Sequence, residues 1–143
     1  MPQIEKASNA YWDFYTNNSM HYVAHESGKW MVFFEFEDMP AIAKHCENIV
    51  LKNICGTTKL SNVPNDKNTG VACFYLNISD KQAHKQLIRY MIDNDLIPRT
   101  QKGRLYNIGF KLDDQTRSGQ YGTDFKPTLK LAEIVDLDTE QFI

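Results

Sequence analysis

Residues 71–78 read Val-Ala-Cys-Phe-Tyr-Leu-Asn-Ile, and this stretch decides the fold that we expect. Every second position on one side of it is apolar: Ala72, Phe74, Leu76 and Ile78. This period of two is typical of a strand with one buried face. Ser79 and Gln82 follow in the spacing of a capping box, which predicts a helix directly after the strand, running to about residue 94.

Upstream, the same kinds of pattern predict further elements. Residues 29–37 alternate in the same way, so we expect a second strand with Trp30, Val32, Phe34 and Phe36 on its buried face. Residues 39–53 have apolar side chains at helical spacing, and residues 57–63 suit a short strand. Residues 8–16 would place three aromatic side chains on one helical face, which predicts a short helix: Tyr11, Trp12 and Tyr15.

Downstream, we expect a strand within residues 105–112, then a loop, and a last strand within 128–135. Strands mixed with helices indicate an α+β class. We expect a curved mixed or antiparallel sheet with helices packed on one face, while the concave face forms a pocket. The length suits a single domain over residues 1–143, with an N-terminal helix and loop over 1–26 and an α+β core over 27–135.

The composition argues against several classes of function. The 16 basic and 18 acidic residues give a net charge of −2, whereas non-specific nucleic-acid binding usually needs a basic excess. No apolar run approaches the roughly 18 residues that span a bilayer, and the N-terminus lacks the pattern of a secretory signal. We therefore expect a cytoplasmic or nuclear-cytosolic protein. Three cysteines without C-x-x-C spacing predict buried thiols and no zinc site: Cys46, Cys55 and Cys73.

Polar side chains on the strand faces opposite the apolar ones form the candidate ligand site. The set is Lys29, Lys59, Tyr75, Asn77, Lys111 and, in the loop beyond, Arg117. If these faces coincide, clustered cations would be stabilised by an anion, and phosphate is the natural candidate. The alternative is that these lysines are ordinary solvated groups.

The histidines give weaker signals. Their spacing matches no metal-binding motif, so we expect neither a metal nor a cofactor. His45 and His84 lie on predicted helices and are expected at the surface. His25 shortly precedes the first long strand and could reach the candidate site, because histidine is a residue type suited to proton transfer near neutral pH.

Several segments resemble the family of basophilic leukaemia-expressed proteins, which is described as having a fold like the cap-binding translation initiation factor. The segments are Ser27-Gly28-Lys29-Trp30, Thr58-Lys59-Leu60-Ser61, Val71 to Tyr75 with Ser79-Asp80, and Phe110-Lys111-Leu112-Asp113 to Gly119-Gln120-Tyr121. The resemblance implies the same α+β class and a site for a phosphorylated ligand.

More distantly, the same positions resemble the secreted bacterial phosphothreonine lyases, whose Arg-Ser-Gly segment corresponds to residues 117–119. This resemblance implies Lys59 as the base that removes the α-proton. The groups that would hold the phosphate are Lys29, Tyr75, Lys111 and Arg117.

The chain departs from the lyase pattern at two positions. Met31 stands where the lyases have the acid histidine, and Asn77 stands where they have a second basic residue. Loss of a general acid slows such a reaction by about 10²–10⁴-fold. Lyase activity would therefore require His25 or His21 as the acid, or a more reactive substrate.

Three functions remain open at this point. The first is a binding module for a phosphorylated small molecule or phosphopeptide, which could sense or sequester a nucleotide. The second is a metal-free lyase that eliminates phosphate, and the third is a protein-interaction domain with a vestigial pocket. The sequence does not decide whether the chain is an enzyme.

Overall fold

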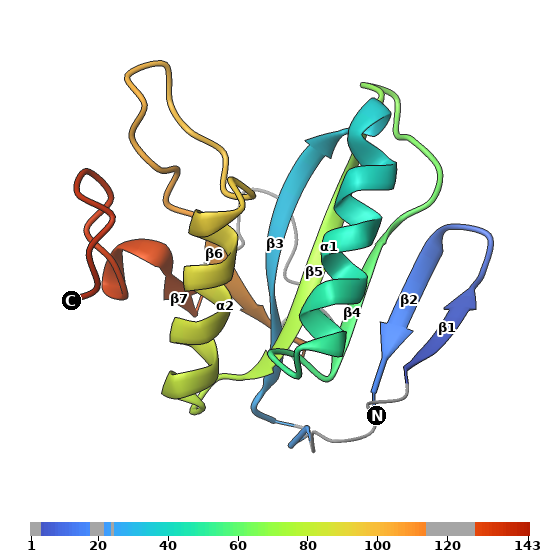
Figure 1. Cartoon of the computed structure of the whole chain (residues 1–143), viewed down its shortest axis with the longest axis horizontal. Helices are drawn as coiled ribbons and strands as arrows, with labels where there is room; N and C mark the ends of the chain where they lie inside the picture. The colour runs from blue at the N-terminus through green and yellow to red at the C-terminus, as the bar shows by residue number, and fades with distance from the viewer. Residues whose placement is uncertain (1–3, 18–21, 24, 114–127) are drawn as a thin grey trace. The chain divides into compact units, whose positions relative to one another are not determined.

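The computed structural model describes residues 4–17, 22–23, 25–113 and 128–143. The elements, drawn in Figure 1, are β1 (Glu5–Ser8), β2 (Trp12–Thr16), β3 (Ser27–Glu35), η1 (Phe36–Asp38), α1 (Met39–Leu51), β4 (Thr57–Ser61), β5 (Thr69–Asn77), α2 (Lys81–Asp93), β6 (Gly109–Leu112), β7 (Leu129–Lys130) and η3 (Leu131–Glu133). In the described part of the chain, neither α-helix has the length and hydropathy needed to cross a bilayer.

The expected α+β class is confirmed. Seven strands form one sheet in the order β1-β2-β4-β5-β3-β6-β7, and the strand pairs with a described register are antiparallel. The long strands expected near residues 29–37 and 71–78 are present as β3 and β5. Both helices expected after them are present as α1 and α2.

The contacts of the chain divide it into two compact units. The first contains residues 4–17 and 32–75, and the second contains the described residues among 22–31 and 76–143. The expectation of one domain over 1–143 stays a prediction, because this grouping does not test whether the units fold separately.

In the first unit, α1 lies across β4 and β5 (Figure 1) and buries its apolar stripe against them. The helix contributes Cys46, Ile49 and Val50 to the core, as its helical spacing predicts. The hydroxyl of Thr58 on β4 is fully buried and donates to the Cys46 carbonyl oxygen at 3.0 Å, so this polar group is satisfied. All three cysteines are buried, and none of them forms a disulfide: Cys46, Cys55 and Cys73.

The helix predicted over residues 8–16 is wrong, and with it the N-terminal helix expected within 1–26. Residues 5–16 form the β1–β2 hairpin, and β2 pairs along its length with β4. The Asn9 side-chain oxygen accepts from the backbone N–H groups of Tyr11 and Trp12, both at 2.8 Å. This turn reverses the chain, and aromatic residues then suit a strand as well as a helix.

We expect Asn9→Ala to lower the free energy of unfolding by about 1 kcal/mol, because the two turn hydrogen bonds lose their acceptor. Urea denaturation followed by circular dichroism measures the change. Asn9→Asp keeps an acceptor oxygen at the same place and should stay close to wild type. Equal loss in both variants would contradict the assigned role of the side-chain oxygen.

In the second unit, α2 begins differently from the prediction. Asp80, and not Ser79, caps the helix: its Oδ1 accepts from the Ala83 N–H at 3.2 Å. The Ser79 hydroxyl donates instead to the Glu26 carboxylate. The last strand is also shorter than expected, because β7 ends at Lys130 and η3 follows it.

His84 is the second correction in this unit, because the sequence placed it at the surface. It is 2% exposed and lies on the buried face of α2. The Trp30 indole N–H donates to His84 Nδ1 at 2.9 Å, and Phe110 packs edge-on against both rings. An aromatic cluster centred on a buried histidine therefore joins α2 to β3 and β6.

Candidate functional site

Two lysines of the second unit lie side by side on neighbouring strands. Lys29 of β3 and Lys111 of β6 are direct register partners in an antiparallel pair. Residues opposite each other in such a pair project to the same face of the sheet, with Cβ atoms about 4.5–5.5 Å apart. The strand pairing thus holds two cationic side chains next to each other.

Both lysines are largely removed from solvent. The Lys29 side chain is 11% exposed and Lys111 is 8% exposed. Burial lowers the pKa of Lys111 from its ordinary value, and the neighbouring charge of Lys29 lowers it further. Lysine is rarely buried in proteins, and two like charges in one place disfavour the folded state. This pair is therefore an unusual arrangement that an anion would stabilise.

The carboxylate of Asp113 lies beside the pair. Lys29 Nζ lies 3.2 Å from Asp113 Oδ1, and the Ser27 hydroxyl donates to Asp113 Oδ2 at 2.8 Å. Asp113 thus forms an ion pair with Lys29. The group formed by Ser27, Lys29, Lys111 and Asp113, which we call the lysine-pair site, carries a net charge of +1 when all its groups are ionised.

Close backbone packing fixes the geometry of the lysine-pair site. Gly28, next to Lys29, has no room for a side chain: an added Cβ would lie 2.5 Å from the Phe110 ring and 2.6 Å from the Lys111 carbonyl oxygen. Glycine is needed here for this close approach of β3 to β6. Trp30 and Phe110 are fully buried behind it, so the strands that carry the lysines rest on a packed core.

In the first unit, Lys59 lies among aromatic rings. Its Nζ is 4.0 Å from the ring centroid of Trp12 and 6.0 Å from those of Phe14 and Tyr75. Phe14 is the register partner of Lys59, and Tyr75 lies two residues along β5 from the partner Cys73. Cation–π attraction of this kind contributes about 0.5–1 kcal/mol at exposed sites and more when desolvated.

Three of the predicted site residues remain: Asn77, His25 and Arg117. The Asn77 side-chain oxygen accepts from the Val23 N–H at 2.9 Å, and the Asn77 carbonyl oxygen accepts from His84 Nε2. Asn77 thus supports the chain segment before β3. His25 is exposed in the turn before β3. Arg117 lies outside the described residues.

The structure therefore brings Lys29 together with Lys111 in one unit, and Lys59 together with Tyr75 in the other. Asp113 was missed as a partner because the sequence suggested only a loop there. Trp12 and Phe14 were missed because a helix was predicted, although their spacing of two residues suits a strand face.

Among the described residues, no three His, Cys, Asp or Glu side chains gather closely enough to hold a metal ion. No protein-family model matches the chain, and no curated protein matches it in a sequence comparison.

Proposed function

We propose that this protein binds a phosphorylated ligand at the lysine-pair site. The observation that carries the proposal is the pairing of Lys29 with Lys111 on adjacent strands, where both side chains are largely buried. A phosphoryl group carries up to two negative charges near neutral pH and accepts several hydrogen bonds. Two ammonium groups with up to six N–H donors match those requirements.

The charge of the lysine-pair site is compatible with a bound phosphoryl group. The net charge of +1 becomes about zero when a phosphate of charge −1 binds, and about −1 when a phosphate of charge −2 binds. Asp113 can remain paired with Lys29 in both cases. Burial lowers the pKa of Lys111 most, and the charge of Lys29 lowers it further; a bound anion would offset this repulsion between the two lysines. Binding should therefore stabilise the folded chain by more than a solvent-exposed ion pair would.

The experiment is a thermal-shift panel of inorganic phosphate, mononucleotides, dinucleotides, cap analogues and a phosphothreonine peptide, each beside its unphosphorylated counterpart. A ligand at 100 times its Kd adds about 2.7 kcal/mol, which corresponds to several degrees in a chain of this size. We expect at least one phosphorylated compound to raise the midpoint, and its counterpart to have no effect.

The variant Lys29→Met should reduce this shift by weakening binding about tenfold or more, since hydrogen bonds to charged groups contribute about 1.5–3 kcal/mol. Lys102→Met is the matched control, because Lys102 is exposed and lies outside the lysine-pair site. A panel without any shift, or a full shift in Lys29→Met, would contradict the proposal.

The same samples test the lyase alternative. Mass spectrometry of the phosphothreonine peptide after incubation separates two outcomes: a binding protein returns the peptide unchanged, whereas a lyase returns a peptide lighter by the mass of phosphoric acid. Lys59, which the resemblance to the lyases implies as the base, would then be the first position to substitute.

A further inference from the structure

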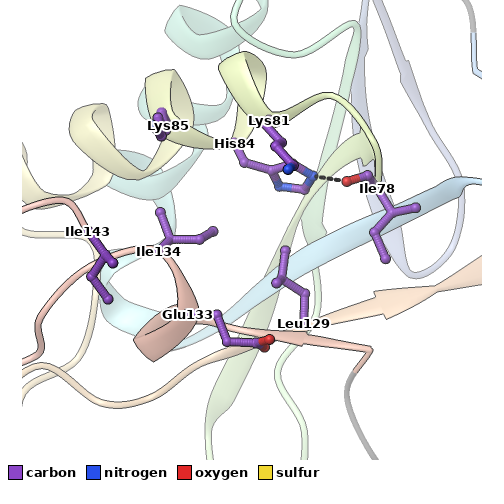
Figure 2. Close-up of a pocket in the computed structure, with 8 residues that line it drawn as sticks. All are labelled: Ile78, Lys81, His84, Lys85, Leu129, Glu133, Ile134 and Ile143. Atoms are coloured by element: carbon purple, nitrogen blue, oxygen red, sulfur yellow. Dashed lines mark hydrogen bonds between the residues drawn. The ribbon is translucent and has the colours of Figure 1, made fainter.

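A separate cavity of about 360 Å³ lies in the second unit, away from the residues of the lysine-pair site. Figure 2 shows its lining: residues of α2 lie on one side of the hollow and residues 129–134 on the other, with Ile143 at one end. This volume is within the range of roughly 300–1,000 Å³ that small-molecule sites occupy.

The walls of the cavity are mainly aliphatic. The aliphatic lining residues are Ile78, Leu129, Ile134 and Ile143. His84 adds one edge, but both of its ring nitrogens already have partners in Trp30 and in the backbone carbonyl groups of residues 77 and 78. The four aliphatic side chains therefore offer a hydrocarbon-like surface, which favours an apolar ligand part.

Two cations complete the lining. Lys81 and Lys85 are four residues apart on α2, so both side chains emerge on the same face of the helix. Within the described part of the chain, neither of them forms an ion pair. Glu133 is the one acidic residue of the lining, and its Oε2 already accepts from the Lys130 N–H at 2.7 Å, where it helps to begin η3.

We propose that this cavity binds a small monocarboxylate with an aliphatic tail. The tail would lie against the isoleucine and leucine side chains, and the carboxylate would lie between the two lysine ammonium groups. The lining carries two positive charges and one negative charge, and the resulting balance of +1 suits one negative charge. A phosphate dianion matches it less well, because Glu133 would repel the second charge.

The test uses octanoate as the probe, followed by the methyl resonances of the isoleucine and leucine residues in the full chain. We expect saturable shifts for Ile78, Leu129 and Ile134. Octylammonium and octan-1-ol have the same tail without the negative charge and should bind at least about tenfold more weakly. Equal binding of either compound, or no saturable shift with octanoate, would overturn the proposal.

A double variant tests the cations. Lys81→Ala with Lys85→Ala should weaken octanoate binding about tenfold, a size consistent with two partly exposed ion pairs. The matched control is Lys44→Ala with Lys102→Ala, which removes the same charge from exposed positions outside the cavity. If both double variants bind octanoate like wild type, the carboxylate does not lie at Lys81 and Lys85, and the proposal fails.

This inference is independent of the lysine-pair site. Lys29→Met should leave octanoate binding unchanged, and the double variant at Lys81 and Lys85 should leave the phosphate response unchanged. If Lys29→Met instead weakens octanoate binding to the same extent as the double variant, the carboxylate has been assigned to the wrong place. The two proposals can thus fail separately.

Discussion

His84→Ala is expected to lower the free energy of unfolding by about 3–5 kcal/mol. The substitution removes the acceptor of the Trp30 indole N–H, and Trp30 is fully buried. A buried donor left without a partner costs about 1–3 kcal/mol. The lost imidazole also leaves a cavity beside Phe110, and large-to-small core substitutions cost about 2–5 kcal/mol. The sum is a large fraction of the 5–15 kcal/mol typical of a folded domain.

Urea denaturation followed by Trp fluorescence and by circular dichroism measures this effect. His25→Ala is the matched control, because His25 is exposed in a turn and a surface substitution usually changes stability by less than about 0.5 kcal/mol. A loss below about 1 kcal/mol in His84→Ala would show that the contact with Trp30 contributes little to stability.

The same histidine gives a pH dependence with a definite sign. Burial lowers the pKa of His84 below its ordinary value, although the carbonyl groups of Asn77 and Ile78 and the charge of Asp80 act in the opposite direction. Since Nδ1 accepts from Trp30, protonation at that atom would break the hydrogen bond. The stability contributed by neutral His84 is present above the unfolded pKa of about 6.5 and is lost as pH falls through the lower folded pKa.

Wild-type stability should therefore fall as the pH is lowered below about 6.5, and the stability of His84→Ala should fall less steeply over the same interval. The difference between the two proteins isolates His84 from His45, whose pKa burial also lowers. Parallel curves for the two proteins would contradict the assignment of the pH dependence to His84.

The core of the fold could be predicted because its strands have one buried face. In β3, the alternation of Trp30, Val32 and Phe34 with more exposed residues is the pattern that the structure contains. The same holds for β5 and for the apolar stripe of α2. Local spacing determines such elements because burial on one face is what stabilises them.

The β1–β2 hairpin could not be predicted in the same way. Its residues are exposed or half-buried, and its register depends on pairing with β4, which lies 49 residues later at Trp12↔Ser61 and 45 residues later at Phe14↔Lys59. A short aromatic segment without a buried face fits a helix or a strand equally well. Pairing with β4 then decides between a helix and a strand, and no window of local sequence contains that information.

Part of the candidate site could be predicted from the sequence for a similar reason. Strand alternation identifies Lys29 and Lys111 as residues opposite the apolar face, but only the observed register makes them direct partners. The partnership of Asp113 with Lys29 and Ser27 spans more than 80 residues of sequence and depends on the same register. The burial of His84 could not be predicted from its helix. This polar residue is buried because Trp30, which lies on another element, supplies its hydrogen bond.

Lys111→Met is expected to separate stability from binding at the lysine-pair site. The pKa of Lys111 is lowered by burial and by Lys29, which means that charging it opposes folding at neutral pH. Replacing Lys111 by an apolar side chain of similar volume removes the cost of holding this charge in the folded chain. We therefore expect the ligand-free variant to be more stable than wild type in urea denaturation.

Binding should change in the opposite direction. Loss of one ammonium group that contacts phosphate costs about 1.5–3 kcal/mol, which weakens the best phosphorylated compound of the panel about 10- to 100-fold. Isothermal titration calorimetry measures this change. A variant that is destabilised by more than about 1 kcal/mol would show that Lys111 supports the fold, and one that keeps its affinity would remove it from the ligand site.

Lys29→Met supplies the contrast that makes the result specific. Lys29 is paired with Asp113, so its removal leaves a half-buried carboxylate that keeps only the Ser27 hydroxyl among the partners described here. That variant should lose stability as well as ligand affinity. Both variants are thus expected to bind the ligand more weakly. The free energy of unfolding should rise in Lys111→Met and fall in Lys29→Met. A lysine pair that served only the fold would lower stability in both variants, and solvated surface lysines would change neither property.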